Sequence, residues 1–279
     1  MPALRQSSPE LANHPEPFPD NCKTGGFAIG AQAWTFREFS VFEAIDKTAA
    51  AGGRVIEFYA GQKLGLDQPG VKFDHNSPDE VIAQVKEHLQ AAGVRAVNYG
   101  VVRIPADEAG ARKIFEFAKK LGLYAVTTES VESMEVIEKL VKELDIRAGF
   151  HNHPRRPADP GYQLWDPKYV LGLVKDRDPR IGAAADVGHW TRSGLDPMEC
   201  LKTLRGRVIS VHLKDVSDKS PGAHDVPFGT GVCGLAGVLT ELKRQNFAGN
   251  ISIEHEYNWA NNVVDVAQGV GFVRGFGAK

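Results

Sequence analysis

The sequence contains few cysteines, no long hydrophobic run and almost no net charge, and each absence argues against a class of protein. Its three cysteines, Cys22, Cys200 and Cys233, have no paired spacing, which argues against a disulfide framework and a cysteine-rich zinc site. No window approaches the roughly 18 consecutive apolar residues of a membrane-spanning helix. The formal net charge of −2 provides no basic surface for nucleic acid or an anionic membrane. We therefore expect neither a nucleic acid nor a membrane as partner.

The first 26 residues differ from the rest of the chain in composition. Residues 1–26 are rich in proline, asparagine, serine and charge, and they lack the apolar core of a signal peptide. We predict a polar N-terminal arm over residues 1–26 and a single domain over residues 27–279. The compartment stays open: cytoplasm if the chain is complete, periplasm if a signal peptide has been removed.

From Phe27 onward, short apolar runs alternate with segments that have the 3.6-residue period of amphipathic helices. The predicted strands are residues 27–33, 54–58, 94–99, 123–128, 146–151, 181–186, 208–213 and 250–254. The predicted helices are residues 106–121, 131–144, 197–205, 235–246 and 262–275, with a weaker one near residue 167. Two further helices are expected, one after Ser40 with Glu43 as capping partner and one after Ser77 with Pro78 as its first residue.

Strict alternation of strands and helices is typical of a parallel sheet, and eight such units are the number that closes a barrel. The alternative is an open, doubly wound sheet, which has a glycine-rich phosphate-binding turn after its first strand. Here the first strand runs into Gln32, Ala33 and Trp34, without that turn. The pattern therefore favours an α/β fold made of a single (β/α)₈ TIM barrel.

Polar residues follow the apolar runs at the predicted strand ends, where the catalytic groups of a TIM barrel lie. They are Trp34, Glu57, Tyr99, Glu129, His151, His153, Asp186, His189, His212, Lys214, Asp215, Glu254 and Glu256. A single polar residue at a strand end is usually structural, but eight ends with the same feature indicate an active site. Glu57 either pairs with a neighbouring arginine or contacts substrate, and Trp34 either packs the barrel top or stacks on a sugar.

Asp186, His212 and Glu254 are the strongest candidates for a metal site. Each interrupts or ends a run of apolar residues, and a buried carboxylate or imidazole needs a partner. Together they form a mixed oxygen and nitrogen ligand set, which suits one divalent metal ion such as Mn²⁺, Co²⁺, Mg²⁺ or Zn²⁺ with positions open to substrate. Such an ion would polarise a carbonyl, while a neighbouring carboxylate or imidazole takes a carbon-bound proton.

Five segments, in order along the chain, resemble the sugar phosphate isomerase/epimerase family, the xylose isomerase-like TIM barrels. They are residues 149–154 (GFHNHP), 185–189 (ADVGH), 211–215 (VHLKD), 227–231 (PFGTG) and 252–256 (SIEHE). The resemblance extends from about Phe27 to the C-terminus and implies the same barrel and a small carbohydrate substrate. It is much less specific for a reaction, because the family includes ketose 3-epimerases, inosose dehydratase, hydroxypyruvate isomerase and 3-keto-glycoside lyases, with endonuclease IV as a distant relative.

The resemblance also implies a ligand set. In the ketose epimerases, residues on strands five to eight hold the ion, and the last three positions match Asp186, His212 and Glu254. The fifth-strand ligand is a glutamate, whose place is taken here by His151. Either His151 is the fourth ligand, or Glu129 reaches over from strand four.

The leading function is a metal-dependent isomerase or epimerase that acts on a ketose-like sugar through an enediolate intermediate. The alternative is a lyase or dehydratase that eliminates across a 3-keto-sugar or 3-keto-glycoside, which the missing strand-five glutamate favours. Two further hypotheses have less support. One is a DNA repair enzyme of the endonuclease IV type, which the net charge of −2 argues against, and the other is a sugar-binding barrel without catalysis.

Each candidate residue has an expected role, and a homo-oligomer is compatible with all of them. The expected catalytic residues are Glu254, His153 and His189, the last of which matches a substrate-binding histidine of the family. The expected substrate-binding residues are Trp34, Glu57 and Lys214. The expected metal ligands are His151, Asp186, His212 and Glu254, with Glu129 as the alternative fourth ligand.

Overall fold

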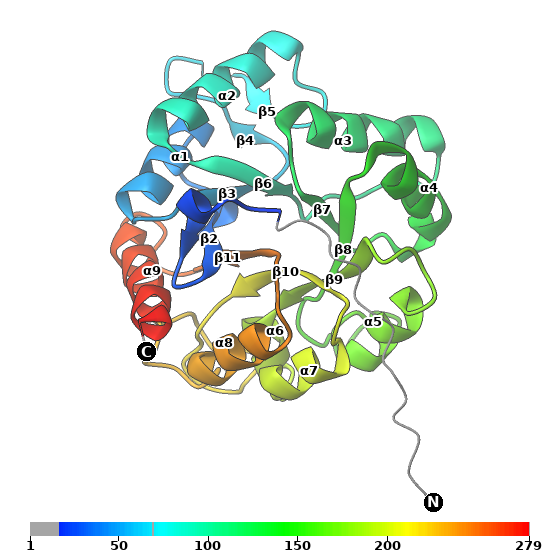
Figure 1. Ribbon diagram of the computed structural model, residues 1–279, viewed down its shortest axis with the longest axis vertical. Coiled ribbons are helices and arrows are strands. Elements are labelled where there is room, and N and C mark those ends of the chain that lie inside the picture. The colour runs from blue at the N-terminus through cyan, green and yellow to red at the C-terminus, as the bar shows by residue number, and fades with distance from the viewer. Residues whose placement is uncertain (1–16, 69, 279) are drawn as a thin grey trace, which may run out of the picture.

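The computed structural model describes residues 17–68 and 70–278, and within them eight parallel strands form a closed barrel (Figure 1). The strands are β2 (Phe27–Gln32), β3 (Val55–Phe58), β6 (Arg95–Tyr99), β7 (Ala125–Thr128), β8 (Arg147–His151), β9 (Ile181–Asp186), β10 (Val208–Leu213) and β11 (Asn250–Ile253). Each strand pairs with the next, and β2 pairs with both β3 and β11, so the sheet closes on itself. The predicted (β/α)₈ barrel is confirmed, and the open doubly wound sheet is excluded.

Helices cover the outside of the barrel (Figure 1). Among the described residues they are α1 (Val41–Ala50), α2 (Asp79–Ala92), α3 (Glu108–Leu121), α4 (Met134–Leu144), α5 (Pro167–Val174), α6 (Val187–Arg192), α7 (Pro197–Thr203), α8 (Leu235–Arg244) and α9 (Val263–Gly277). Short additional elements are the two-residue strands β1 (Lys23–Thr24), β4 (Gln62–Lys63) and β5 (Lys72–Phe73) and 3₁₀ turns at Asp20–Cys22, Ala33–Phe36 and Val131–Ser133. The large apolar core lies between strands and helices, where residues such as Phe58 and Phe115 are fully buried.

Two helix starts were predicted from capping signals, and one of them is displaced. Ser40 and Glu43 form the expected reciprocal capping box at the start of α1. For α2 the prediction is wrong by one residue, because Pro78 is the N-cap and the helix begins at Asp79. Ser77 instead accepts the backbone N–H of Asp74 at 3.0 Å, in the turn before the helix.

Strand register places the candidate residues of the site beside one another. In the parallel ladder, His212 of β10 lies opposite Asp186 of β9 on one side and Ser252 of β11 on the other. His151, at the end of β8, lies opposite Ala184 of β9. Since parallel strands all end at the same rim of a barrel, these side chains gather at its carboxyl-terminal mouth.

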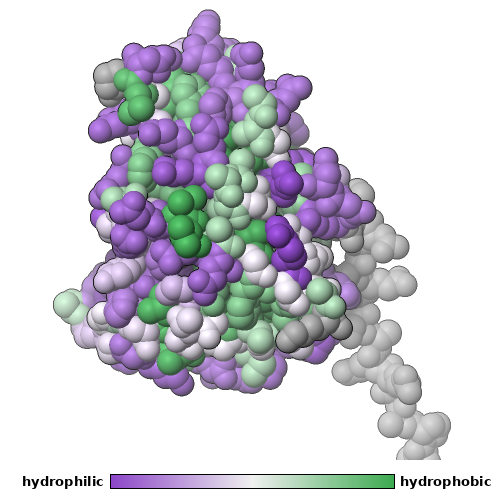
Figure 2. Space-filling model, turned by 90° about the vertical axis from the view of Figure 1, so that its left-hand side faces the viewer, coloured by the Kyte–Doolittle hydropathy of each residue, from purple (hydrophilic) through white to green (hydrophobic). Residues whose placement is uncertain are grey.

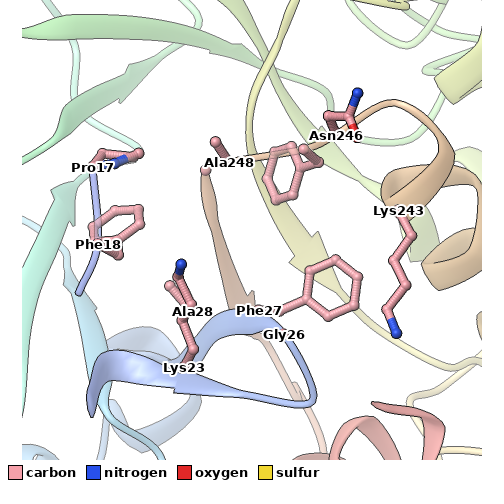
Figure 3. A pocket seen from close by; sticks show the side chains of 11 residues that line it. Pro17, Phe18, Lys23, Gly26, Phe27, Ala28, Lys243, Asn246 and Ala248 are labelled. Atoms are coloured by element: carbon pink, nitrogen blue, oxygen red, sulfur yellow. The ribbon is translucent and has the colours of Figure 1, made fainter. Parts of the chain in front are cut away.

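The opposite end of the barrel is covered by the segment that precedes β2. β1 pairs antiparallel with β2, and Phe18 and Cys22 pack in a small cluster with Ala28, Val55 and Val97. A cavity of about 200 Å³ lies there, between this segment and the turn from α8 to β11 (Figure 3). The described end of the predicted arm, residues 17–26, thus lies against the barrel; residues 1–16 are outside the described residues.

The surface is mixed in polarity. On the face shown in Figure 2, hydrophobic residues lie in small groups between hydrophilic ones. The large apolar side chains that are exposed, Leu66, Val232, Tyr257 and Val264, come from separate parts of the chain. Across residues 17–278, apart from residue 69, the structure has no helix with the length and hydrophobicity needed to cross a membrane.

Candidate active site and metal centre

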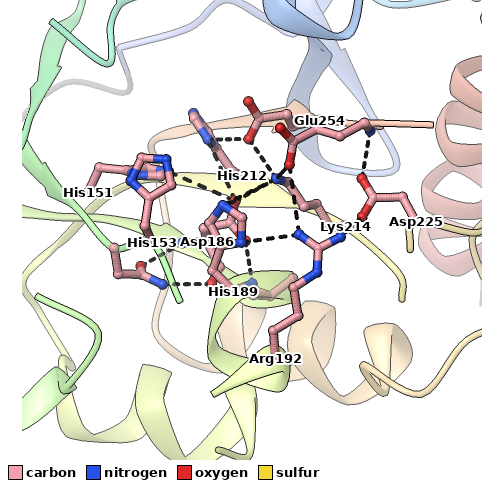
Figure 4. Close-up of polar contacts among 12 residues, drawn as sticks. His151, His153, Asp186, His189, Arg192, His212, Lys214, Asp225 and Glu254 are labelled. Atoms are coloured by element: carbon pink, nitrogen blue, oxygen red, sulfur yellow. Dashed lines mark hydrogen bonds and ion pairs between the residues drawn. The ribbon is translucent and has the colours of Figure 1, made fainter. Parts of the chain in front are cut away.

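Four candidate ligands come together at the carboxyl ends of β8 to β11. His151 ends β8, Asp186 ends β9, His212 lies in β10 and Glu254 directly follows β11. One ligand atom from each lies within 4.8 Å of the others, and all four side chains are buried (Figure 4). The structure therefore brings together the four residues that were predicted as a group.

Asp186 divides its two carboxylate oxygens between the fold and this cluster. Oδ1 accepts the backbone N–H of His189 at 2.7 Å and so caps α6, a short helix that the sequence did not predict. Asn152 fixes the backbone of Asp186 with hydrogen bonds of 2.8 and 3.0 Å. Oδ2 has no hydrogen-bond partner among the described residues and lies 3.8 Å from His151 Nε2. The Lys214 ammonium is the cation beside this oxygen, with Nζ 3.3 Å away.

His212 is held between two carboxylates. Its Nδ1 lies 3.0 Å from Glu254 Oε2, and its Nε2 lies 3.0 Å from Glu57 Oε2. Burial lowers the pKa of His212, but Glu57 and Glu254 outweigh this effect and raise the pKa well above its ordinary value. Glu57 also accepts hydrogen bonds from the Ser252 and Thr127 hydroxyls. The structure thus places the fully buried side chain of Glu57 beside His212 and not in the position expected for a substrate contact.

Lys214 is the second predicted substrate contact that the structure places elsewhere. Its side chain is fully buried, and Nζ lies 2.5 Å from Glu256, 3.1 Å from Glu254 and 3.3 Å from Asp186. Burial disfavours the ammonium, but these carboxylates raise the pKa of Lys214 well above its ordinary value. Its charge offsets part of the negative charge of the cluster, because a buried carboxylate needs a compensating cation.

His189 is held in place by Arg192 and by the groups that bind Arg192, which the sequence did not predict. Arg192 Nη1 lies 3.2 Å from His189 Nδ1, and the guanidinium is itself held by Asp225 and by the carbonyl of Ala223. Burial, followed by the nearby Lys214 ammonium, lowers the pKa of His189 well below its ordinary value. Lys214 Nζ lies 3.4 Å from His189 Nε2, so each ring nitrogen faces a cationic donor, which disfavours a charged ring. No motif in the sequence marks Arg192 or Asp225.

Glu129 lies beside two histidines. Its Oε1 is 2.6 Å from His153 Nδ1, 2.6 Å from the Tyr162 hydroxyl and 3.9 Å from His151 Nδ1. Burial raises the pKa of Glu129, but the surrounding hydrogen-bond donors outweigh it and hold the pKa far below its ordinary value. Both ring nitrogens of His151 lack a hydrogen-bond partner among the described residues.

A cavity of about 330 Å³ opens onto this cluster. It is lined by Gln32, Trp34, Tyr59, Ala60, Gly100, Val101, His151, His153, His189, Glu254 and Glu256. Trp34 stands edge-on to Tyr59, with ring centroids 5.0 Å apart, and Arg37 lies over the Trp34 ring. Trp34, His153, His189 and Glu254 thus line one pocket, whereas Glu57 and Lys214 do not.

Three other strand-end residues have structural roles. Tyr99 is buried on the helix side, where its hydroxyl lies 3.0 Å from His75 Nδ1. Asp215 accepts three backbone N–H groups and fixes the loop over residues 229–233. His255 lies 3.6 Å from Asp265 of α9, on the helix side of the barrel. Strand ends of a barrel therefore supply loop anchors as well as site residues.

Comparison with known proteins identifies the family. The profile of the xylose isomerase-like TIM barrel matches residues 45–275. The chain belongs to this family. A crystal structure of an uncharacterized protein from Parabacteroides distasonis ATCC 8503 is 31% identical, with a TM-score of 0.70, and the match covers 88% of this chain and 98% of that one. A sugar phosphate isomerase/epimerase from the same organism shares the fold at 15% identity, with a TM-score of 0.64 over 90% of this chain and 95% of that one.

A second relative matches a shorter part of the chain. SgbU of Escherichia coli (strain K12), provisionally assigned as an L-ribulose-5-phosphate 3-epimerase, is 38% identical over 73 residues. This match covers 25% of our chain and about a quarter, 26%, of the length of that relative.

The buried cluster of this xylose isomerase-like barrel could hold a metal ion. Both ring nitrogens of His151 are buried without hydrogen bonds among the described residues, which is costly unless a cation or water completes them. Asp186 Oδ2 also has no hydrogen bond there and is compensated by the Lys214 ammonium 3.3 Å away. Two carboxylates and two imidazoles are a donor set that divalent ions accept. The family pattern is kept at Asp186, His212 and Glu254 and departs at His151.

Proposed function

We propose that this protein is a metal-dependent sugar isomerase or epimerase that acts on a ketose-like sugar through an enediolate intermediate. The observation that carries the proposal is the double position of Glu254. Its carboxylate belongs to the buried cluster with His151, Asp186 and His212, and it also lines the 330 Å³ pocket. A base that touches both a metal site and a substrate pocket suits proton removal from a carbon next to a carbonyl. The partial match to SgbU supports a ketose substrate.

The residues that would hold the ion are His151, Asp186, His212 and Glu254, and the ion would be Mn²⁺, Co²⁺, Mg²⁺ or Zn²⁺. When bound, such an ion supplies polarisation of the substrate carbonyl. His151 is the proposed fourth ligand rather than Glu129, because Glu129 is already engaged by His153 and Tyr162.

The chain's own residues would carry the proton transfers. Burial raises the pKa of Glu254, but Lys214 and His212 outweigh it and lower the pKa well below its ordinary value, so the carboxylate is ionised, as a general base has to be before it acts. His153 lies in the same pocket as the second acid–base group. His189 lines the same pocket and would form a hydrogen bond with a substrate hydroxyl. Trp34 offers an aromatic face to the sugar ring.

A lyase or dehydratase is the second candidate, and the observation that favours it is His153 beside Glu129 in a barrel that lacks the strand-five glutamate. In that reaction Glu254 takes the proton alpha to the carbonyl. The bond from the β-carbon to its oxygen then breaks, and the leaving oxygen takes a proton from the His153 imidazolium. The product is the α,β-unsaturated carbonyl compound and a free hydroxyl compound.

One screen tests both candidates. Protein loaded with each of the four ions is incubated in D₂O with a panel of ketoses, L-ribulose 5-phosphate and 3-keto-glycosides. Products are identified by NMR, and deuterium at the carbon alpha to the carbonyl is quantified. An epimer or isomer that carries deuterium supports the leading proposal, and an unsaturated product supports the second. Metal binding without turnover or exchange on any substrate would contradict both proposed reactions and would favour a sugar-binding barrel without catalysis.

A further inference from the structure

We infer that Glu129 is a positioning residue that holds the ring proton of His153 on Nδ1 and, when an ion is bound, that of His151 on Nδ1 as well. Both Nε2 lone pairs are then available, one to the buried cluster and one to the pocket. The inference deepens the proposed function and rests on it for the metal-bound state of His151 and for what the two Nε2 atoms do. The His153 tautomer is a property of the metal-free protein.

The barrel places Glu129 where it can serve both rings. β7 ends at Thr128, which pairs with Phe150 of β8, so Glu129 and His151 leave neighbouring strands side by side. His153 follows two residues later on the same loop. Its ring stands nearly perpendicular to that of His151, with centroids 4.8 Å apart. One carboxylate therefore faces the Nδ1 atoms of two successive histidines.

The hydrogen bonds around Tyr162 show that Glu129 acts as an acceptor. The Tyr162 oxygen accepts the backbone N–H of His153 at 2.6 Å, so its own hydrogen is directed to Glu129 Oε1, also at 2.6 Å. Oε1 is also 2.6 Å from His153 Nδ1. An ionised carboxylate has no hydrogen to donate, so Nδ1 of His153 must be the donor. In the neutral ring this leaves Nε2 of His153 as the atom that can take a proton.

For His151 the two ring nitrogens face two carboxylates at nearly equal distances. Nε2 lies 3.8 Å from Asp186 Oδ2, and Nδ1 lies 3.9 Å from Glu129 Oε1. A histidine ligand must present a bare nitrogen, and it nearly always donates its other N–H to a carboxylate or carbonyl. On the Nδ1 side the nearby carboxylate is Glu129, which at 3.9 Å forms no hydrogen bond in the metal-free protein; once an ion takes Nε2, the proton has to lie on Nδ1, facing Glu129. His212 has the same kind of support from Glu57, with the roles of its ring nitrogens exchanged.

Two other roles for Glu129 fit the geometry less well. As a fourth ligand it would have to bind through Oε2, because both of its 2.6 Å hydrogen bonds occupy Oε1, the oxygen that lies nearest to His151. Glu129, His151 and His153 also lie close enough to hold a second ion of their own. The 2.6 Å contact between Glu129 and His153 closes that space, because two ligands of one ion are held apart by the ion between them.

The test is an NMR measurement on protein with ¹⁵N-labelled histidine, in which long-range correlations to the ring carbons identify the protonated nitrogen. Metal-free wild type should show the Nδ1–H tautomer for His153, and protein loaded with Zn²⁺ alone should show it for His151 as well. An Nε2–H tautomer at His153 in the wild type would overturn the inference without any variant. This outcome does not depend on finding a substrate, so it is separable from failure of the proposed function.

Substitutions at Glu129 and Tyr162 test the inference further. Glu129→Leu removes the acceptor and should shift His153 toward the Nε2–H tautomer and weaken Zn²⁺ binding about 10- to 100-fold, the usual effect of losing such a support. Tyr162→Phe is the matched control: it removes a donor to the same oxygen, keeps the carboxylate and should keep both tautomers. Unchanged tautomers in Glu129→Leu would overturn the inference. So would two equivalents of Zn²⁺ in the wild type with one lost in Glu129→Leu, which would make Glu129 a ligand.

Discussion

Glu57 Oε2 lies 3.0 Å from His212 Nε2, and this pair joins β3 to β10 across the barrel interior. His212 therefore presents only Nδ1 to Asp186 and Glu254. Ser252 and Thr127 donate to the same carboxylate, so Glu57 is itself fixed in place. A carboxylate that holds the far nitrogen of a candidate ligand sets both its tautomer and its orientation.

Glu57→Gln should weaken metal binding because the neutral amide carbonyl is a weaker acceptor for the imidazole N–H than the carboxylate. We expect a loss of about 10- to 100-fold in affinity for Zn²⁺, measured by competition with a chromophoric chelator. Glu87→Gln on the exposed face of α2 makes the same chemical change away from the site and should leave affinity unaltered. Equal affinities in wild type and Glu57→Gln would show that His212 is not a ligand or needs no support.

Asp186→Asn should remove the metal while it preserves the fold. Asparagine is as good an N-cap as aspartate, so the bond from Oδ1 to His189 N can remain and α6 should keep its start. The group that replaces Oδ2 is an amide, which is a poor ligand without charge. Elemental analysis should find about one equivalent of metal per chain in the wild type and little in the variant.

The matching stability measurement separates binding from folding. Without metal, the wild type and Asp186→Asn should melt within a few degrees of each other. Added metal should raise the melting temperature of the wild type only, because a ligand stabilises the state that binds it. Full metal occupancy in Asp186→Asn would show that Asp186 is not a metal ligand.

Much of this site could be predicted because the residues that end successive strands of a parallel barrel lie next to one another at one rim. Asp186 and His212 are 26 residues apart, yet both stand at the ends of adjacent parallel strands, so their proximity follows from the fold. The direction in which each of these side chains points could not be predicted from the sequence. Glu57 and Lys214 also lie at strand ends, but one serves His212 and the other is enclosed by carboxylates. Tyr162 comes from a loop between β8 and α5, whose path no periodicity predicts.

Glu254→Gln should suppress turnover and deuterium uptake together. The carboxylate is the proposed acceptor of the carbon-bound proton, and removal of a general base typically costs about 10²- to 10⁴-fold in rate. The measurement is incorporation of deuterium alpha to the substrate carbonyl in D₂O, with metal content determined in the same sample. Because Glu254 is also a proposed ligand, the comparison must be made at saturating metal. Retained exchange in fully metallated Glu254→Gln would assign the base to another residue, with His153 the next candidate.

His151→Glu is the substitution that distinguishes an epimerase from a lyase. It restores the glutamate that the resemblance places on strand five, and a carboxylate can both bind the ion and take a proton from the second face of the substrate. It also places a negative charge beside Glu129, whose Oε1 lies 3.9 Å from the present His151 ring, so metal affinity and melting temperature must be measured with activity. If the natural reaction is elimination, the variant should lose unsaturated product and gain an epimer, because the new carboxylate can exchange a proton with the second face of the substrate before the leaving oxygen departs. If the natural reaction is epimerisation, the same variant should keep its product and change only the rate. Equal epimerase activity in both proteins would show that the exchange of glutamate for histidine on β8 does not select the reaction.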